Sequence, residues 1–176
     1  MARLRNLLIR LRGGEPLPAG VTMPLERRER ILTWGRVRGG AIAAATDVGL
    51  RIVGPDHVPT LHRWHEIARA VWDDGALEVE GTDRTVVRYR MPEPRGVPAA
   101  VREHVTATVV VSVRHEIGAG VGIRAVARRN LSTGELVWSA VPDRGLDPGD
   151  PQIRAQGEAL VERVRRRYAG ERGQMI

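Results

Sequence analysis

Four tight-turn sequences divide the middle of this chain and constrain its fold more than any other feature. Each turn contains glycine beside polar residues and lies between short runs of apolar and β-branched residues. Short runs that are joined by tight turns pair as antiparallel strands, which predicts an antiparallel meander. The turns are residues 38–40, 47–49, 73–75 and 81–83, and the predicted strands are residues 31–37, 41–46, 50–53, 68–72, 77–80 and 85–89.

The segment after residue 90 predicts a helix and then a second hairpin. Pro98 is a favoured first residue for a helix, and Val101 and Val105 lie on one side of it. The end of this helix stays open between residues 106 and 113, because the β-branched run 109–113 also fits a strand. The second hairpin joins residues 122–129 to residues 135–141.

A second helix closes the chain. Asp150 is a good N-cap, Pro151 fits the first turn, and Gly170 is the expected end. Apolar residues recur along one face at helical spacing. These face residues are Ile153, Gly157, Leu160, Val161, Val164 and Tyr168.

Composition indicates an aliphatic core. Phenylalanine and cysteine are both absent, so Trp34, Trp64, Trp72 and Trp138 are the large aromatic candidates for the core. The lack of cysteine excludes disulfides, thiolate nucleophiles and cysteine-ligated metals. The longest nearly uncharged apolar run, residues 105–113, is too short for a membrane-spanning helix, and we expect a cytoplasmic protein.

The positive charge lies at the two ends of the chain. All 28 basic residues are arginine, and the arginines outnumber the acidic residues by seven to three in residues 1–30 and by six to three in residues 151–176. The fifteen arginines of residues 31–150 are balanced by fifteen acidic residues. The middle of the chain is therefore not a basic nucleic-acid domain, and an anionic partner is expected to meet the ends.

The N-terminal twelve residues predict a short amphipathic helix with leucines on one arc and arginines on both sides. Such a helix lies at a membrane interface, packs on its own domain, or packs on a second subunit. In the last case the terminal helices would form a homodimer, and this alternative is kept. Residues 1–24 comprise this segment and a Pro/Gly linker over residues 13–24, and residues 25–176 are expected to form one domain. The candidate contact residues are Arg3, Arg5, Leu7, Leu8, Arg10, Leu11, Arg12, Arg163, Arg166 and Arg167.

Three sequence patterns could indicate a metal site or a phosphate-binding site, but each fits an ordinary structural role better. His62, His65 and Glu66 do not have the order of a zinc-protease motif, and the aspartates 143, 147 and 150 fit a turn that leads into a helix cap. The glycines of residues 118–122 are followed by a strand pattern rather than by a phosphate-binding helix. We predict no catalytic, cofactor-binding or metal-binding residue, and no cofactor.

Four motifs carry a family resemblance: Ala44-Ala45-Thr46-Asp47-x-Gly49-Leu50-x-Ile52, Arg63-Trp64-x-x-Ile67-x-x-Ala70, Val101-Arg102-Glu103-x-Val105-Thr106 and Gly145-Leu146-Asp147-Pro148-x-Asp150-Pro151. With the first two, part of the chain resembles bacterial pleckstrin-homology-like (PH-like) domains. With the last two, the rest resembles a family of proteins from high-GC bacteria that share this first half. The resemblance covers about residues 26–168. It implies an arrangement of seven strands followed by one closing helix. This chain differs from that arrangement, because further strands are predicted after its first helix.

The expected fold class is thus α+β: an antiparallel PH-like sheet or partly open barrel with an internal helix, a second hairpin and a C-terminal helix. The resemblance implies a scaffold for docking, and the leading hypothesis is a non-enzymatic module that binds a protein partner or an anionic membrane surface, peripherally at the membrane in the second case. Two alternatives stay open: a nucleic-acid-binding accessory protein that uses the same arginines, and an enzyme with a pocket in the sheet.

Overall fold

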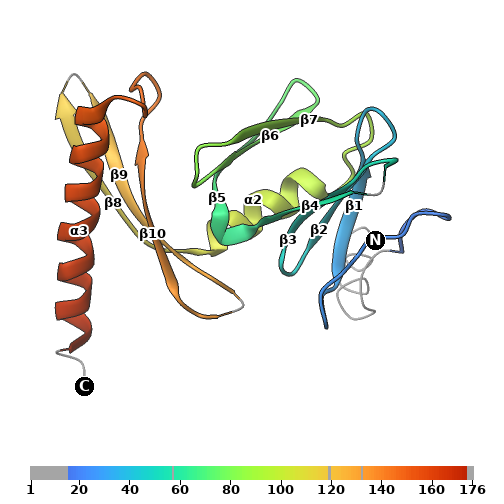
Figure 1. Ribbon diagram of the computed structural model, residues 1–176, viewed down its shortest axis with the longest axis horizontal. Coiled ribbons are helices and arrows are strands. Elements are labelled where there is room, and N and C mark those ends of the chain that lie inside the picture. The colour runs from blue at the N-terminus through green and yellow to red at the C-terminus, as the bar shows by residue number, and fades with distance from the viewer. Residues whose placement is uncertain (1–15, 57, 119, 132, 174–176) are drawn as a thin grey trace, which may run out of the picture. The chain divides into compact units, whose positions relative to one another are not determined.

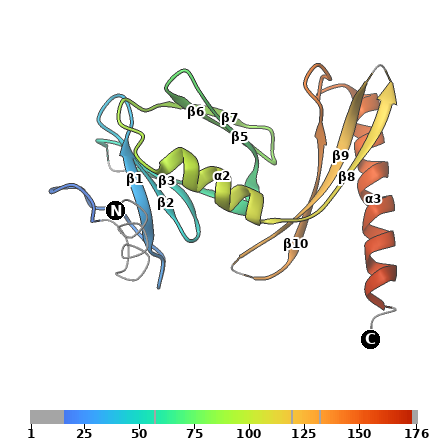
Figure 2. The same ribbon diagram turned by 180° about the vertical axis from the view of Figure 1, so that it is seen from behind.

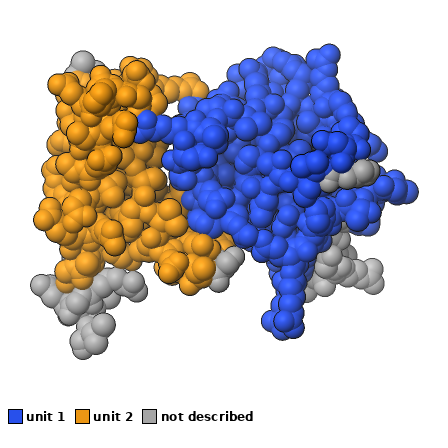
Figure 3. Space-filling model, in the orientation of Figure 1, with its two compact units in different colours: residues 1–107 blue, residues 108–176 orange. Residues whose placement is uncertain are grey.

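The computed structural model describes residues 16–56, 58–118, 120–131 and 133–173. The chain divides into two compact units, residues 1–107 (unit 1) and residues 108–176 (unit 2), shown in Figure 3. The stretch 25–176, expected as one domain, includes the boundary between them. All strand pairs are antiparallel and form three sheets, so the predicted α+β class is confirmed.

Unit 1 contains seven strands in two meanders, followed by one helix (Figure 1). The first sheet has the order β1-β2-β3-β4 and the second has the order β5-β6-β7. A 3₁₀ turn, η1 (Trp64–Glu66), connects them. The elements are β1 (Ile31–Arg36), β2 (Ile42–Thr46), β3 (Gly49–Val53), β4 (Pro59–Arg63), β5 (Ile67–Asp73), β6 (Ala76–Gly81), β7 (Val86–Arg90) and α2 (Val97–Ala107).

The core of unit 1 lies between the inner faces of its two sheets and α2. Leu50 and Ile52 alternate inward on β3, and Leu77 and Val79 do so on β6. Helix α2 runs alongside both sheets in Figures 1 and 2 and adds Val101, which is fully buried. Burial of one such aliphatic side chain stabilises the fold by about 1.5–3 kcal/mol, so a core without phenylalanine still suffices.

The chain segment after β7 holds the two sheets together at one corner. The Arg36 amide donates to the Glu93 carbonyl and the Arg38 amide donates to the Arg90 carbonyl, both at 2.8 Å. Gly35 allows this approach, because a Cβ atom there would lie 2.7 Å from the carbonyl oxygens of Glu93 and Pro94. The described strands of unit 1 therefore form two sheets joined at a corner rather than a closed barrel.

Residues 16–30 cover the outer face of the first sheet. Met23 packs with Trp34, and the Trp34 indole N–H donates to the Pro16 carbonyl at 2.8 Å. The Arg95 guanidinium lies 4.0 Å from the Trp34 ring centre, within cation–π range. The part of the Pro/Gly stretch that the structure describes, residues 16–24, thus lies against the sheet without pairing to it, as a proline-rich segment can.

A buried ion pair lies on the same outer face. Arg51 of β3 makes two hydrogen bonds to the Glu29 carboxylate, at 2.7 and 2.6 Å. The Glu29 side chain is fully buried and that of Arg51 is 8% exposed. Burial alone would raise the pKa of Glu29, but hydrogen bonds from Arg51 and from the Glu26 amide outweigh it and lower the pKa.

Unit 2 is a three-stranded sheet with one helix on one face (Figures 1 and 2). Ile123 and Ala125 of the central strand pack against Leu160 and Val164 of the helix. Gly157 permits close contact, since a Cβ atom there would lie 2.8 Å from the Ala140 methyl carbon. The elements are β8 (Val109–Gly118), β9 (Val121–Arg129), β10 (Leu136–Pro142) and α3 (Pro151–Gly173), and the strand order is β10-β9-β8.

Some predicted boundaries need correction. No strand was predicted over β4, because Pro59-Thr60-Leu61-His62-Arg63 shows no clear alternation. The first helix ends at Ala107, and the β-branched run after it is strand β8. Helix α3 continues past Gly170 to Gly173. The prediction that Trp72 is a core residue is wrong, because it is 40% exposed at the end of an edge strand.

Candidate functional site

A hollow of about 400 Å³ opens in unit 1 between β4, the η1 turn and the β6–β7 loop. Its apolar wall is formed by Leu61 and Ile67, and its other lining side chains are polar or acidic. In a chain with 28 arginines, none of the lining residues is an arginine. The polar and acidic lining consists of His62, Glu66, Thr82, Asp83 and Thr85.

His62 and Tyr89 meet beside this hollow. His62 is on the inner face of β4 because it pairs with the buried Leu50, and Tyr89 is on the inner face of β7 because it pairs with the buried Leu77. The imidazole Nε2 and the phenol oxygen are hydrogen-bonded at 2.6 Å. The two residues are 27 positions apart, and only the packing of the two sheets brings them together.

Both members of this pair are neutral near pH 7. Burial lowers the pKa of His62, and the carboxylates of Glu66 and Asp83 only partly oppose this effect. Burial also raises the pKa of Tyr89. A neutral hydrogen-bonded pair thus lies within the electrostatic reach of two carboxylates.

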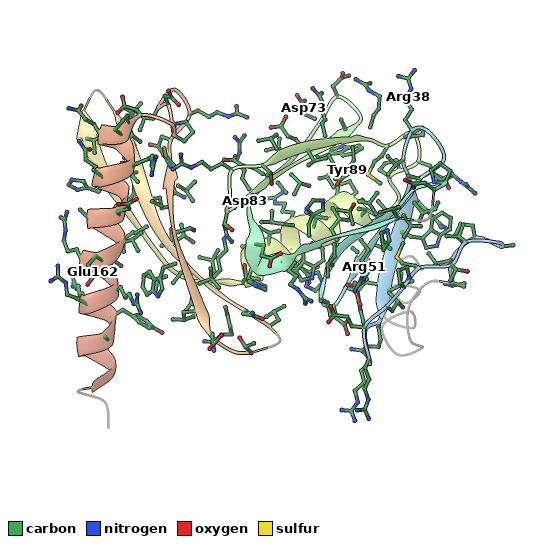
Figure 4. The ribbon with its side chains drawn as sticks, in the orientation of Figure 1. Arg38, Arg51, Asp73, Asp83, Tyr89 and Glu162 are labelled. Atoms are coloured by element: carbon green, nitrogen blue, oxygen red, sulfur yellow. The ribbon has the colours of Figure 1, made fainter. Side chains whose placement is uncertain are left out.

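Asp83 is held in place by its own loop. The Thr85 amide and hydroxyl both donate to Asp83 Oδ1, at 3.0 and 2.7 Å, and these bonds lower the pKa of Asp83. Figure 4 places Asp83 at one end of the second sheet and Asp73 at the other end. The two aspartates therefore lie at opposite ends of one sheet and do not belong to one site.

The histidines considered for a metal site are divided between two elements. His62 is on β4, whereas His65 lies in the η1 turn, so one strand does not contain both. Burial lowers the pKa of His65, Glu66 opposes this shift and Arg63 adds to it. In the described ranges, no three metal-ligating side chains are grouped so that they could hold an ion.

The aspartates near the start of α3 form turn and cap interactions. Asp143 accepts hydrogen bonds from Arg114, at 2.6 and 3.1 Å, and from the Gly122 amide. Asp147 accepts from the Gly149 amide at 2.8 Å, and Asp150 accepts from the Gln152 amide at 2.7 Å. The predicted cap at Asp150 is confirmed, and the strand pattern predicted after the glycines of residues 118–122 is part of β9, which pairs with β8.

Four exposed arginines lie within five residues of α3, distributed around the helix on both sides of its buried face. The buried side of the helix packs on the sheet of unit 2, which leaves these arginines in solvent. One of them, Arg166, has its Nε atom 3.5 Å from Glu162, one turn earlier. An exposed pair of this kind neutralises little of the local charge. This arginine surface consists of Arg163, Arg165, Arg166 and Arg167.

The candidates in residues 3–12 lie outside the described residues, so the structure places only Arg163, Arg166 and Arg167 of the predicted contact residues.

Comparison of the chain with family models, with curated proteins and with solved structures finds no match. Within the described ranges, no helix has the length and apolar character that crossing a membrane requires.

Proposed function

We propose that this chain is a non-enzymatic docking module that meets an anionic membrane surface through the arginine surface of α3. The observation that carries this proposal is the exposure of four arginines within five residues on a helix whose apolar face is already packed. Such a helix attracts an anionic surface electrostatically without inserting its apolar side. Attraction is worth about 1 kcal/mol per arginine near an anionic membrane.

Unit 1 supports the scaffold part of this proposal. Two antiparallel meanders of four and three strands, followed by a helix that packs against both sheets, follow the order that the PH-like resemblance implies. Strands β8–β10 and α3 then form a separate unit rather than an insertion in this arrangement. We propose a PH-like unit 1 that is followed by a unit carrying the basic surface.

Flotation of the full chain with vesicles tests the proposal. Replacing Arg163, Arg166 and Arg167 by glutamine removes three positive charges and is expected to weaken binding to phosphatidylserine vesicles about a hundredfold. The control removes three exposed arginines from unit 1: Arg27, Arg38 and Arg88. It should bind within a few fold of the native chain.

Two outcomes would contradict this proposal. Equal loss of binding in both triple variants would mean that net charge rather than α3 determines binding. Tighter, salt-sensitive binding to RNA than to vesicles, abolished by the α3 substitutions, would favour the nucleic-acid alternative. Deleting residues 1–12 measures the separate contribution of the N-terminal arginines.

A further inference from the structure

We infer that the hollow of unit 1 is a binding site for a small alkylguanidinium compound. This inference does not depend on the function proposed for α3, because it rests on unit 1 alone. A volume of about 400 Å³ falls within the range of small-molecule sites in proteins.

The lining matches both parts of such a ligand. Leu61 is half-buried and supplies most of the apolar side-chain surface for an alkyl chain, because Ile67 is buried in the core. Around it, Glu66 and Asp83 supply carboxylate oxygens, and Thr82 supplies a hydroxyl group. A planar guanidinium presents five N–H donors and can bond several such acceptors at once.

The His62–Tyr89 pair makes the hollow favour a cation over an anion. Because both groups are neutral, the two carboxylates are the charges among the lining residues. Both carboxylates line the hollow, and both raise the pKa of His62 against the effect of burial. Arg84 is exposed in the same loop but is not one of the lining residues.

Asp83 is already positioned to receive the ligand. Thr85 donates two hydrogen bonds to Oδ1, which restrains the carboxylate, and Oδ2 takes no part in these two bonds. A preorganised acceptor avoids the entropy cost of ordering a side chain on binding. Asp83→Asn keeps an oxygen acceptor for Thr85 while it removes the charge, so this variant separates ligand binding from loop structure.

The test is an NMR titration of the full chain with butylguanidinium, with butylurea as the neutral compound of the same shape. We expect butylguanidinium to shift the ring signals of His62 and Tyr89 and butylurea to leave them unchanged. Asp83→Asn should weaken the binding about threefold to fivefold, since Asp83 is exposed and its ion pair with the ligand is lost. Asp73→Asn removes the same charge at the other end of the sheet and should leave the affinity unchanged.

Three results would overturn the inference: no shift of either ring with butylguanidinium, equal shifts with butylurea, or equal weakening by Asp83→Asn and Asp73→Asn. A Glu66→Gln variant provides an independent check on the second carboxylate. If Asp83→Asn proves unstable, weakening by Glu66→Gln alone supports the site, and unchanged affinity in Glu66→Gln overturns it.

Discussion

Glu29 and Arg51 combine full burial with two short hydrogen bonds on the outer face of the first sheet. Removing one partner of a buried ion pair leaves an uncompensated charge, which costs about 3–5 kcal/mol. We predict that Glu29→Gln lowers the free energy of unfolding by about 3 kcal/mol, at the lower end because Glu26 lies 3.7 Å from Arg51. Chemical denaturation measures this change.

The matched control is Glu93→Gln. Glu93 pairs with Arg36 at 3.2 Å, but both side chains are 52% exposed. An exposed pair contributes at most about 1 kcal/mol. Similar losses in the two variants would show that burial does not determine the contribution of the Glu29–Arg51 pair.

The same residue predicts a dependence of stability on pH. Because the folded pKa of Glu29 lies below its ordinary value of 4.5, its stabilisation is complete above that pH and is lost as the pH falls through the folded pKa. Denaturation between about pH 6 and about pH 3 should therefore show a steeper decline for the native chain than for Glu29→Gln. Parallel curves would contradict a lowered pKa.

The His62–Tyr89 pair could not be predicted from the sequence. His62 was considered with its neighbours His65 and Glu66, whereas its hydrogen-bond partner lies on a strand of the other sheet. Local patterns contain no information on which inward-facing residues of two sheets meet. The cap at Asp150 could be predicted, since its partners are two and three residues away.

Among the elements, the strands bounded by glycine turns were predicted well, including β2 and β3, which are buried throughout, and β4 was missed. The first two residues of β4, Pro59 and Thr60, are exposed, and the strand lies at the edge of its sheet, so the hydrophobic pattern is weak there. The packing of residues 16–24 on Trp34 could not be predicted either. A composition rich in proline and glycine indicates that a segment lacks helix and strand, but it does not indicate whether the segment packs on a sheet.

Helix α3 packs closely on its sheet at Gly157, where an added Cβ atom would lie 2.8 Å from the Ala140 methyl carbon. We predict that Gly157→Leu destabilises the chain by about 1–3 kcal/mol, since the added side chain would overlap Ala140. Ala155→Leu adds a similar side chain on the exposed side of the same helix and should change stability little. Thermal unfolding of the two variants tests the prediction, and equal melting temperatures would contradict the packing of α3 through Gly157.

At the scale of the whole molecule, the two units have separate cores. We expect that Glu29→Gln lowers amide hydrogen-exchange protection in unit 1 and that Gly157→Leu lowers it in unit 2. Protection in the other unit should stay near its native level in each variant. Loss of protection across both units in either variant would mean that the chain unfolds as one cooperative body.

Exposed arginines occur in both units, but they are absent from the lining of the hollow and closely spaced on α3. The hollow of unit 1 has no arginine among its lining residues, whereas unit 2 exposes four arginines at 163 and 165–167. Attraction of such exposed arginines to an anionic surface decreases with salt, because the Debye length is only about 8 Å at physiological ionic strength. Binding to an anionic membrane should therefore weaken steeply as salt increases.

The absence of cysteine allows the contact to be mapped directly. A spin label at Ala169→Cys lies on α3, and a label at Ala99→Cys lies on an exposed position of unit 1. With phosphatidylserine vesicles that carry a nickel-chelating lipid, we predict that nickel broadens or relaxes the label at 169 far more than the label at 99. Equal effects at both positions, or a stronger effect at 99, would contradict docking through α3.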